Sequence, residues 1–138
     1  MEAVVLCGIQ GSGKTTLYRD RFLATHVRVG MDLLRTRHRE AAFVALCLET
    51  RQPFVVDNTN PTPADRRRYV APARAAGFKV IGYLVETDAP RSVNAPPHAA
   101  GMTARRFVRP APEEGFDELW HATGRWRIEP LVTTPPLF

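Results

Sequence analysis

Cysteine, lysine and long apolar runs are scarce in this chain of 138 residues. Its two cysteines, Cys7 and Cys47, lack metal-ligand spacing and are too few for a disulfide framework, so we expect buried, reduced thiols in a cytoplasmic protein. No apolar run approaches the roughly 20 residues that span a bilayer, and the first residues are too few and too acidic for a signal peptide. These absences argue against a membrane protein and against a secreted, disulfide-rich one.

The sequence also has no internal repeat and no low-complexity spacer, so we expect a single domain over residues 1–138. Of its 19 basic residues only Lys14 and Lys79 are lysine, and the formal net charge is +5. An excess of basic over acidic residues favours a polyanionic partner such as nucleic acid, although net charge also increases solubility.

Short apolar runs alternate with stretches of helical character along the chain. This alternation favours an α/β domain of three layers, with a central parallel sheet of four or five strands, right-handed crossovers and helices on both faces. After Glu86 a loop at 87–97 and a helix at 99–107 are expected. The predicted strands are 3–7, 26–29, 53–56, 78–85 and 126–128, and the predicted helices are 15–25, 30–50 with a break, and 62–76.

A glycine-rich loop follows the first predicted strand. The segment Gly8-Ile-Gln-Gly-Ser-Gly-Lys-Thr15 matches GxxxxGK[ST] at every fixed position, which is the pattern of a phosphate-binding P-loop. The glycines let successive backbone N–H groups curl around phosphates, Lys14 reaches the β and γ oxygens, and the Thr15 hydroxyl ligates Mg²⁺. We therefore expect ATP with Mg²⁺ to bind at Gly8, Gln10, Gly11, Ser12, Gly13, Lys14, Thr15 and Thr16.

Polar residues follow the third predicted strand, which ends at Val56. Asp57 stands where a strand-end carboxylate orients Mg²⁺ or its water. Asn58 and Thr59 add amide and hydroxyl groups that suit an acceptor ribose or phosphate. The stretch from Asp57 to Pro61 also has the composition of an ordinary turn without a functional role. Its expected place on the same sheet edge as the P-loop favours the metal and substrate roles.

Asp32 is expected at the carboxyl end of the second strand, the sheet edge where ligands bind. It and Arg35, spaced i and i+3, share a face if this stretch is helical. An aspartate there can take the proton of an attacking hydroxyl, and an arginine can hold an acceptor phosphate. An N-cap aspartate beside a surface arginine is the alternative that spacing leaves open.

Other conspicuous residues have simpler interpretations. The run from Arg66 to Arg68 is typical of a solvated helix face, and the four histidines show no metal-ligand pattern. Trp120 and Trp126 are more typical of packing than of base stacking.

Four elements together resemble the kinase domain of polynucleotide 5′-kinases. They are the P-loop, Asp32-Leu-Leu-Arg35, Val55-Val-Asp-Asn-Thr-Asn-Pro61 and Phe107-Val-Arg-Pro-Ala-Pro-Glu-Glu-Gly-Phe116, in that order, over residues 1 to about 118. The resemblance implies transfer of the γ-phosphate of ATP to a 5′-hydroxyl of DNA or RNA. It implies Asp32 as general base, Arg35 as an acceptor-phosphate contact, and Asn58 with Thr59 on the acceptor side, and it places the adenine near residues 107–116.

The chain departs from that family after the fourth strand. Members carry a lid helix there with two arginines that clamp the donor phosphates, whereas residues 86–94 compress the region and keep Arg91 alone. Arg91 is thus the expected lid arginine, with Arg105 or Arg106 as substitutes. Two alternatives remain open: a kinase for a small nucleoside, sugar or antibiotic, and a non-catalytic ATP-binding module of a larger assembly.

Overall fold

The computed structural model describes residues 1–86, 106–124 and 126–131. These residues form a six-stranded sheet in the order β2-β3-β1-β4-β5-β6. Every neighbouring pair is parallel except β5 and β6, which are antiparallel. The elements are β1 (Glu2–Cys7), α1 (Lys14–Arg21), β2 (Val27–Val29), α2 (Met31–Leu34), α3 (Arg37–Glu49), β3 (Phe54–Asp57), α4 (Pro63–Ala75), β4 (Lys79–Glu86), the 3₁₀ turn η1 (Pro112–Glu114), β5 (Glu118–Thr123) and β6 (Arg127–Pro130).

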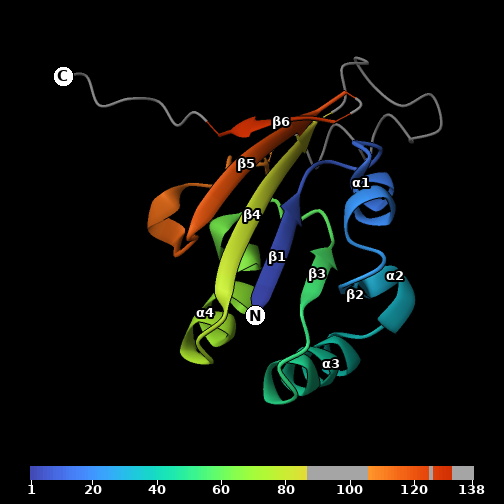
Figure 1. Cartoon of the computed structure of the whole chain (residues 1–138), viewed down its shortest axis with the longest axis vertical. Helices are drawn as coiled ribbons and strands as arrows, with labels where there is room; N and C mark the ends of the chain where they lie inside the picture. Colours follow the sequence, from blue (N-terminus) through green and yellow to red (C-terminus); the bar gives the residue numbers. More distant parts are fainter. Residues whose placement is uncertain (87–105, 125, 132–138) are drawn as a thin grey trace.

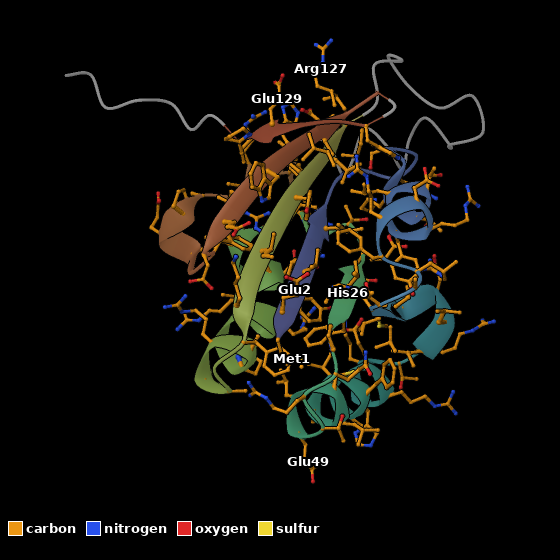
Figure 2. All side chains as sticks on the ribbon, viewed as in Figure 1. Met1, Glu2, His26, Glu49, Arg127 and Glu129 are labelled. Atoms are coloured by element: carbon orange, nitrogen blue, oxygen red, sulfur yellow. The ribbon has the colours of Figure 1, made fainter. Side chains whose placement is uncertain are left out.

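The strands β1, β3 and β4 point the same way, and α1 begins at the end where their arrowheads lie (Figure 1). The predicted parallel sheet with helices on both faces is therefore confirmed. Two details differ from the expectation. β5 was not predicted as a strand, and β6 adds an antiparallel edge to the predicted four or five parallel strands, with Arg127 and Glu129 on it (Figure 2).

The central strand β1 is buried on both faces, because Ala3 to Cys7 are all inaccessible to solvent. Helix α1 covers one face of the sheet, and α3 with α4 covers the other. The cluster on the α1 side contains Val4, Leu6, Leu17, Tyr18, Phe22, Val55, Ile81, Val85 and Ala122. The cluster on the α3 and α4 side includes Ala3, Val5, Cys7, Val44, Cys47, Phe54, Val56, Tyr69, Val70, Ala73 and Phe78.

The helix boundaries follow from capping residues. The N-cap Thr62 accepts a hydrogen bond from the Asp65 amide at 3.2 Å, and Gly77, with φ 79°, follows the end of α4, both as expected. The expected break in the region 30–50 is also present, since Arg35 has φ 75° and Thr36 caps the next helix, α3.

The histidine and cysteine interpretations are confirmed at three positions. His26 Nε2 lies 2.8 Å from Glu2 Oε1, so the ring is held by a local partner (Figure 2). Cys7 and Cys47 are both buried free thiols. No helix within the described ranges is long and apolar enough to cross a membrane.

Arg66 corrects the interpretation of the arginine run as a solvated helix face. Its side chain is fully buried, and its Nε and Nη2 donate to the two carboxylate oxygens of Glu114 at 2.7 and 2.9 Å. Its Nη1 donates to the Asn60 carbonyl at 2.8 Å. Arg67 and Arg68 are exposed, as expected. A bidentate pair of this kind fastens the segment around η1 to α4 and to the turn after β3.

We predict that Arg66→Ala lowers the free energy of unfolding by about 3–5 kcal/mol, because it leaves the Glu114 carboxylate without its cation in a largely buried setting. Urea denaturation followed by circular dichroism measures this. The exposed neighbour provides the control, since Arg67→Ala should change stability by less than about 0.5 kcal/mol. Equal effects of the two substitutions would contradict the structural role of Arg66.

Candidate active site

The P-loop connects the buried end of β1 to the first residue of α1. Gly11 and Gly13 have φ of 84° and 100°, in the left-handed region that favours glycine. The Gly8 amide donates to the Thr59 carbonyl at 3.1 Å, which ties the loop to the turn after β3. The loop conformation therefore depends on a neighbouring strand as well as on its own glycines.

Gly8 has no room for a side chain. A Cβ at this position would lie 2.6 Å from the Val85 carbonyl oxygen and 2.6 Å from the Ser12 hydroxyl. The first contact is with the backbone of β4, which does not move easily. The Ser12 hydroxyl is buried, without a hydrogen-bond partner among the described residues, and lies inside the loop.

Lys14 begins α1 and is 8% exposed. Its Nζ donates to the Gly8 carbonyl at 2.8 Å and to the Ile9 carbonyl at 3.1 Å, so the ammonium group lies within the curve of the loop. Burial lowers the pKa of Lys14, and the negative charge of Asp57 opposes that shift. The loop thus concentrates a positive charge where a phosphate would lie.

Asp57 ends β3 and joins three elements of the site. Its Oδ2 accepts the Thr15 hydroxyl at 2.8 Å and Arg28 Nε at 2.8 Å. Arg28 Nη2 also lies 3.4 Å from the Thr15 hydroxyl. The expected proximity of Thr15 and Asp57 is confirmed, and Arg28 of β2 is a third member that the sequence did not indicate. A basic residue in a short strand is normally unremarkable, so no local signal pointed to it.

One pocket of about 740 Å³ lies at this carboxyl edge of the sheet. It brings together most of the residues that the sequence predicted for nucleotide and acceptor binding. Arg28, Arg37 and Arg106 also line it; of these only Arg106 was considered from the sequence, as a substitute for the lid arginine. The predicted residues in the lining are Gln10, Gly11, Gly13, Lys14, Thr15, Thr16, Asp32, Asp57, Asn58 and Thr59.

Asp32 lies on α2, exposed, in the wall of this pocket. The Met31 amide donates to the Asn58 side-chain oxygen at 3.0 Å, which fixes the start of α2 against the turn after β3. Arg35 follows the end of α2 and does not line the pocket. The helical face that Asp32 and Arg35 were expected to share does not form, because α2 ends at Leu34. Arg91 and the compressed lid lie outside the described residues.

A second pocket of about 470 Å³ lies on the other side of the P-loop. Gly13, Thr16 and Gly124 contribute to its lining, and Trp126 forms one wall. The indole Nε1 of Trp126 donates to Asp20 Oδ2 at 2.9 Å, so α1 holds the ring beside the loop. Trp126, which directly precedes β6, therefore lines this pocket and also packs against the core cluster on the α1 side, as the sequence led us to expect.

Cys7 is the thiol nearest to the loop, directly before Gly8. It is fully buried, and burial raises the pKa of the thiol to about 12. At neutral pH the group is protonated and inaccessible. It therefore belongs to the core and is not a nucleophile.

Comparison with known proteins supports this description of the fold. The structure superposes on Chaetomium thermophilum Kti12 in complex with ADP-AlF3 with a TM-score of 0.67 and 15% identity, covering 89% of each chain. A gluconokinase from Sinorhizobium meliloti gives a TM-score of 0.58 at 14% identity, over 88% of this chain and 82% of that one. The Mycobacterium tuberculosis APS kinase in complex with AMPPNP and APS gives 0.58 at 16%, over 90% and 88%. The fold is that of the P-loop NTPases.

Sequence comparison is more limited. No family model matches the chain. Over 70 residues the chain is 34% identical to the bifunctional polynucleotide phosphatase/kinase of Schizosaccharomyces pombe. This match covers 50% of the chain but only 17% of that protein. The likeness is thus a partial similarity to a polynucleotide kinase within a kinase-like P-loop fold.

We predict that Gly8→Ala lowers the free energy of unfolding by about 1–3 kcal/mol, because the new methyl group must displace the Val85 carbonyl. Urea denaturation is again the measurement. Gly77→Ala provides a contrast, since Gly77 has φ 79° and open space around its Cβ position: its cost is that of a positive φ, whereas Gly8 has no positive φ and its cost is that of the steric contact. If the Gly8→Ala protein is as stable as the wild type, the backbone of β4 must shift away from the new methyl group at little energetic cost.

Proposed function

We propose that this protein is an ATP-dependent phosphotransferase whose acceptor is the 5′-hydroxyl of a DNA or RNA end. The observation that carries the proposal is that Lys14, Thr15, Asp57 and Asp32 line one pocket at the carboxyl edge of the sheet. The partial likeness to a polynucleotide phosphatase/kinase and the net charge of +5 support a nucleic acid as the acceptor. The buried free thiols are consistent with a reduced, cytoplasmic setting.

Each residue has a distinct role in the proposed reaction. Asp32 takes the proton of the acceptor hydroxyl. The hydroxyl oxygen forms a bond to the γ-phosphorus of ATP while the bond from that phosphorus to the β–γ bridging oxygen breaks, and ADP leaves. Lys14 offsets negative charge on the transferred phosphoryl group, together with the loop amides. Asn58 and Thr59 lie on the acceptor side. We keep Arg91 as a proposed lid arginine, and Arg106, in the pocket wall, is a second candidate for that role.

The residues present fit a magnesium ion bound with the nucleotide. The Thr15 hydroxyl and the Asp57 carboxylate are in contact in the pocket wall, and the described residues contain no cluster of three or more His, Cys, Asp or Glu that would form a metal cage. Mg²⁺ typically takes one or two protein ligands and completes its shell with water and phosphate oxygens. When bound, it would neutralise charge on the β- and γ-phosphates. Thr15 and Asp57 would hold it.

We place the nucleoside part of ATP in the second pocket, between Thr16 and Trp126. This differs from the position near residues 107–116 that the family resemblance implies. Phe116 at the end of that segment is 8% exposed and packs in the core, and Glu114 is paired with Arg66. The indole of Trp126, beside the P-loop, offers an apolar face of the kind that nucleobases stack on.

A small-molecule acceptor is the second candidate. The similarity in fold to a gluconokinase and an APS kinase favours it. The same P-loop site would then transfer phosphate to a nucleoside, sugar or antibiotic. A non-catalytic ATP-binding module is the remaining alternative, in which ATP binds without transfer to any hydroxyl.

We predict that ATP changes the tryptophan fluorescence of the protein through Trp126. Trp126→Phe should abolish most of this change while calorimetry still detects binding, whereas Trp120→Phe, on β5, should preserve it.

Lys14→Ala should weaken ATP binding about ten- to hundredfold, since it removes a charge-assisted contact to the phosphates. Binding that is indifferent to Lys14→Ala would contradict the P-loop assignment.

We predict transfer of labelled γ-phosphate from ATP to a short single-stranded oligonucleotide with a 5′-hydroxyl, in the presence of Mg²⁺. Asp32→Asn should lower the rate by about 10²–10⁴, as expected for loss of a general base. Glu49→Gln is the matched control, because Glu49 is an exposed carboxylate at the end of α3, away from the pocket (Figure 2). Full activity of Asp32→Asn would remove the base assignment.

The same assay separates the candidate acceptors. If a small hydroxyl compound is the true acceptor, excess oligonucleotide should not compete with it. ATP binding without any labelling, restored by a second protein, would support the non-catalytic module instead.

A further inference from the structure

Arg28 is the middle residue of the edge strand β2, and its side chain turns toward helix α1. Its neighbours Val27 and Val29 belong to the core cluster on the α3 and α4 side. Because side chains alternate along a strand, Arg28 faces the opposite side of the sheet, where α1 begins. The Tyr18 hydroxyl donates to the His26 carbonyl at 2.6 Å and so ties α1 to the start of this strand. The fold thus brings a cation from outside the sequence motifs into the main pocket.

This arginine contacts the same two groups that we propose as magnesium ligands. Its Nε donates to Asp57 Oδ2 at 2.8 Å, and its Nη2 lies 3.4 Å from the Thr15 hydroxyl oxygen. The Thr15 hydroxyl itself donates to Asp57 Oδ2 at 2.8 Å. Mg²⁺ binds its oxygen ligands at about 2.0–2.1 Å, so an ion on both oxygens would crowd the guanidinium and repel it by like charge. Arg28 and Mg²⁺ therefore compete for the Thr15–Asp57 pair.

Asp57 needs a cation beside it whichever of the two is bound. Its side chain is only 3% exposed, whereas that of Arg28 is 23% exposed. A buried carboxylate that loses its partner is strongly destabilised, but one that exchanges a cation for another keeps its charge compensated. Arginine is the partner that can move, because its flexible stem carries a guanidinium that already reaches the pocket.

The other cations of the pocket are held elsewhere. Lys14 Nζ donates to two carbonyls of the P-loop, and Arg37 is paired with Glu40. Arg28 is thus the cation of this pocket that the described residues place against Thr15. A triphosphate held by the P-loop amides lies beside this threonine, which directly follows the phosphate-binding lysine. The Nη1 of Arg28 makes no hydrogen bond within the described ranges, so it is available to a phosphate oxygen.

We propose that Arg28 is a resident cation of the magnesium site, which neutralises Asp57 and binds the triphosphate without metal, and which gives up the Thr15 hydroxyl when Mg²⁺ binds. The dependence of ATP binding on Mg²⁺ is therefore weak in this protein. The inference rests on the donor half of the proposed function, the binding of ATP with Mg²⁺ at the P-loop. A guanidinium suits the role, because it is always charged and its N–H donors match carboxylate and phosphate oxygens.

Calorimetric titration with ATP, in excess EDTA and in excess Mg²⁺, tests the proposal. The quantity to compare is the ratio of the two dissociation constants, EDTA over Mg²⁺. Arg28→Ala should weaken binding about ten- to hundredfold in EDTA, since Asp57 is then an unpaired negative charge beside the phosphates, and change it little in Mg²⁺. The ratio should therefore be at least about tenfold larger in Arg28→Ala than in the wild type. Equal ratios overturn the inference.

Arg37→Ala is the matched control, because Arg37 lines the same pocket but is held by Glu40 instead of by Asp57. It should keep the wild-type ratio, and a ratio raised as much as in Arg28→Ala would overturn the assignment to Arg28. If Arg28→Ala fails to fold by circular dichroism, Arg28→Gln takes its place, since it keeps a long stem and a donor for Asp57 but removes the charge. It too should raise the ratio at least about tenfold, and an Arg28→Gln protein with the wild-type ratio overturns the inference.

Manganese binding separates this inference from phosphate transfer. Mn²⁺ prefers the same oxygen ligands as Mg²⁺, and electron paramagnetic resonance distinguishes its free from its bound form. Without nucleotide, Arg28→Ala should bind Mn²⁺ at least about tenfold more tightly than the wild type, because the guanidinium no longer competes for the Thr15–Asp57 pair. Adding Asp57→Asn to Arg28→Ala should remove this gain.

The outcomes of these titrations are distinct from those of the transfer assay. If both titrations give the expected differences but no hydroxyl compound is phosphorylated, the proposed transfer fails and the role of Arg28 stands. If phosphate is transferred but Arg28→Ala binds Mn²⁺ no better than the wild type, the proposed function stands and the resident cation is overturned.

Discussion

The parallel pairing of β1 with β3 on one side and with β4 on the other is the constraint on which the site depends. It aligns Leu6 with Asp57 and Cys7 with Leu84, so the P-loop and the turn after β3 emerge at the same edge. The Thr15 hydroxyl then reaches the Asp57 carboxylate at 2.8 Å. A shift of register would move the P-loop along the turn after β3 and separate these groups.

Two ion-pair networks, each built around one buried charged side chain, support the rest of the pocket. The pair Arg66–Glu114 also engages the Asn60 carbonyl and so supports the turn after β3 from α4. Glu40, with Arg37 and Asn58, supports the start of α2 from α3. Buried ion pairs contribute little net stability, but they define the geometry of the groups that they join. This side of the pocket is therefore organised by residues that contact one another across three helices.

Much of the fold was predictable, because β1, β3 and β4 are largely apolar runs, and the helix signals at Thr62 and Gly77 are local. β5 was missed since Glu-Leu-Trp-His-Ala-Thr is only half apolar and becomes a strand through its pairing with β4 and β6. The buried Arg66 was missed because three successive arginines occupy three different directions around a helix, and only packing decides which one faces Glu114.

By itself, the sequence determined the P-loop, the strand-end carboxylate Asp57 and the position of Asp32 at the same edge, because each depends on a strand, a turn or a helix start that is encoded locally. The tertiary structure alone decided which arginines serve the pocket. Arg28 and Arg37 line it and Arg35 does not, although all three lie within ten residues of one another. The direction of a long charged side chain is set by its partner. Arg28 pairs with Asp57, which lies far away along the chain, and Arg37 pairs with Glu40, which lies one turn further along α3 on its buried face.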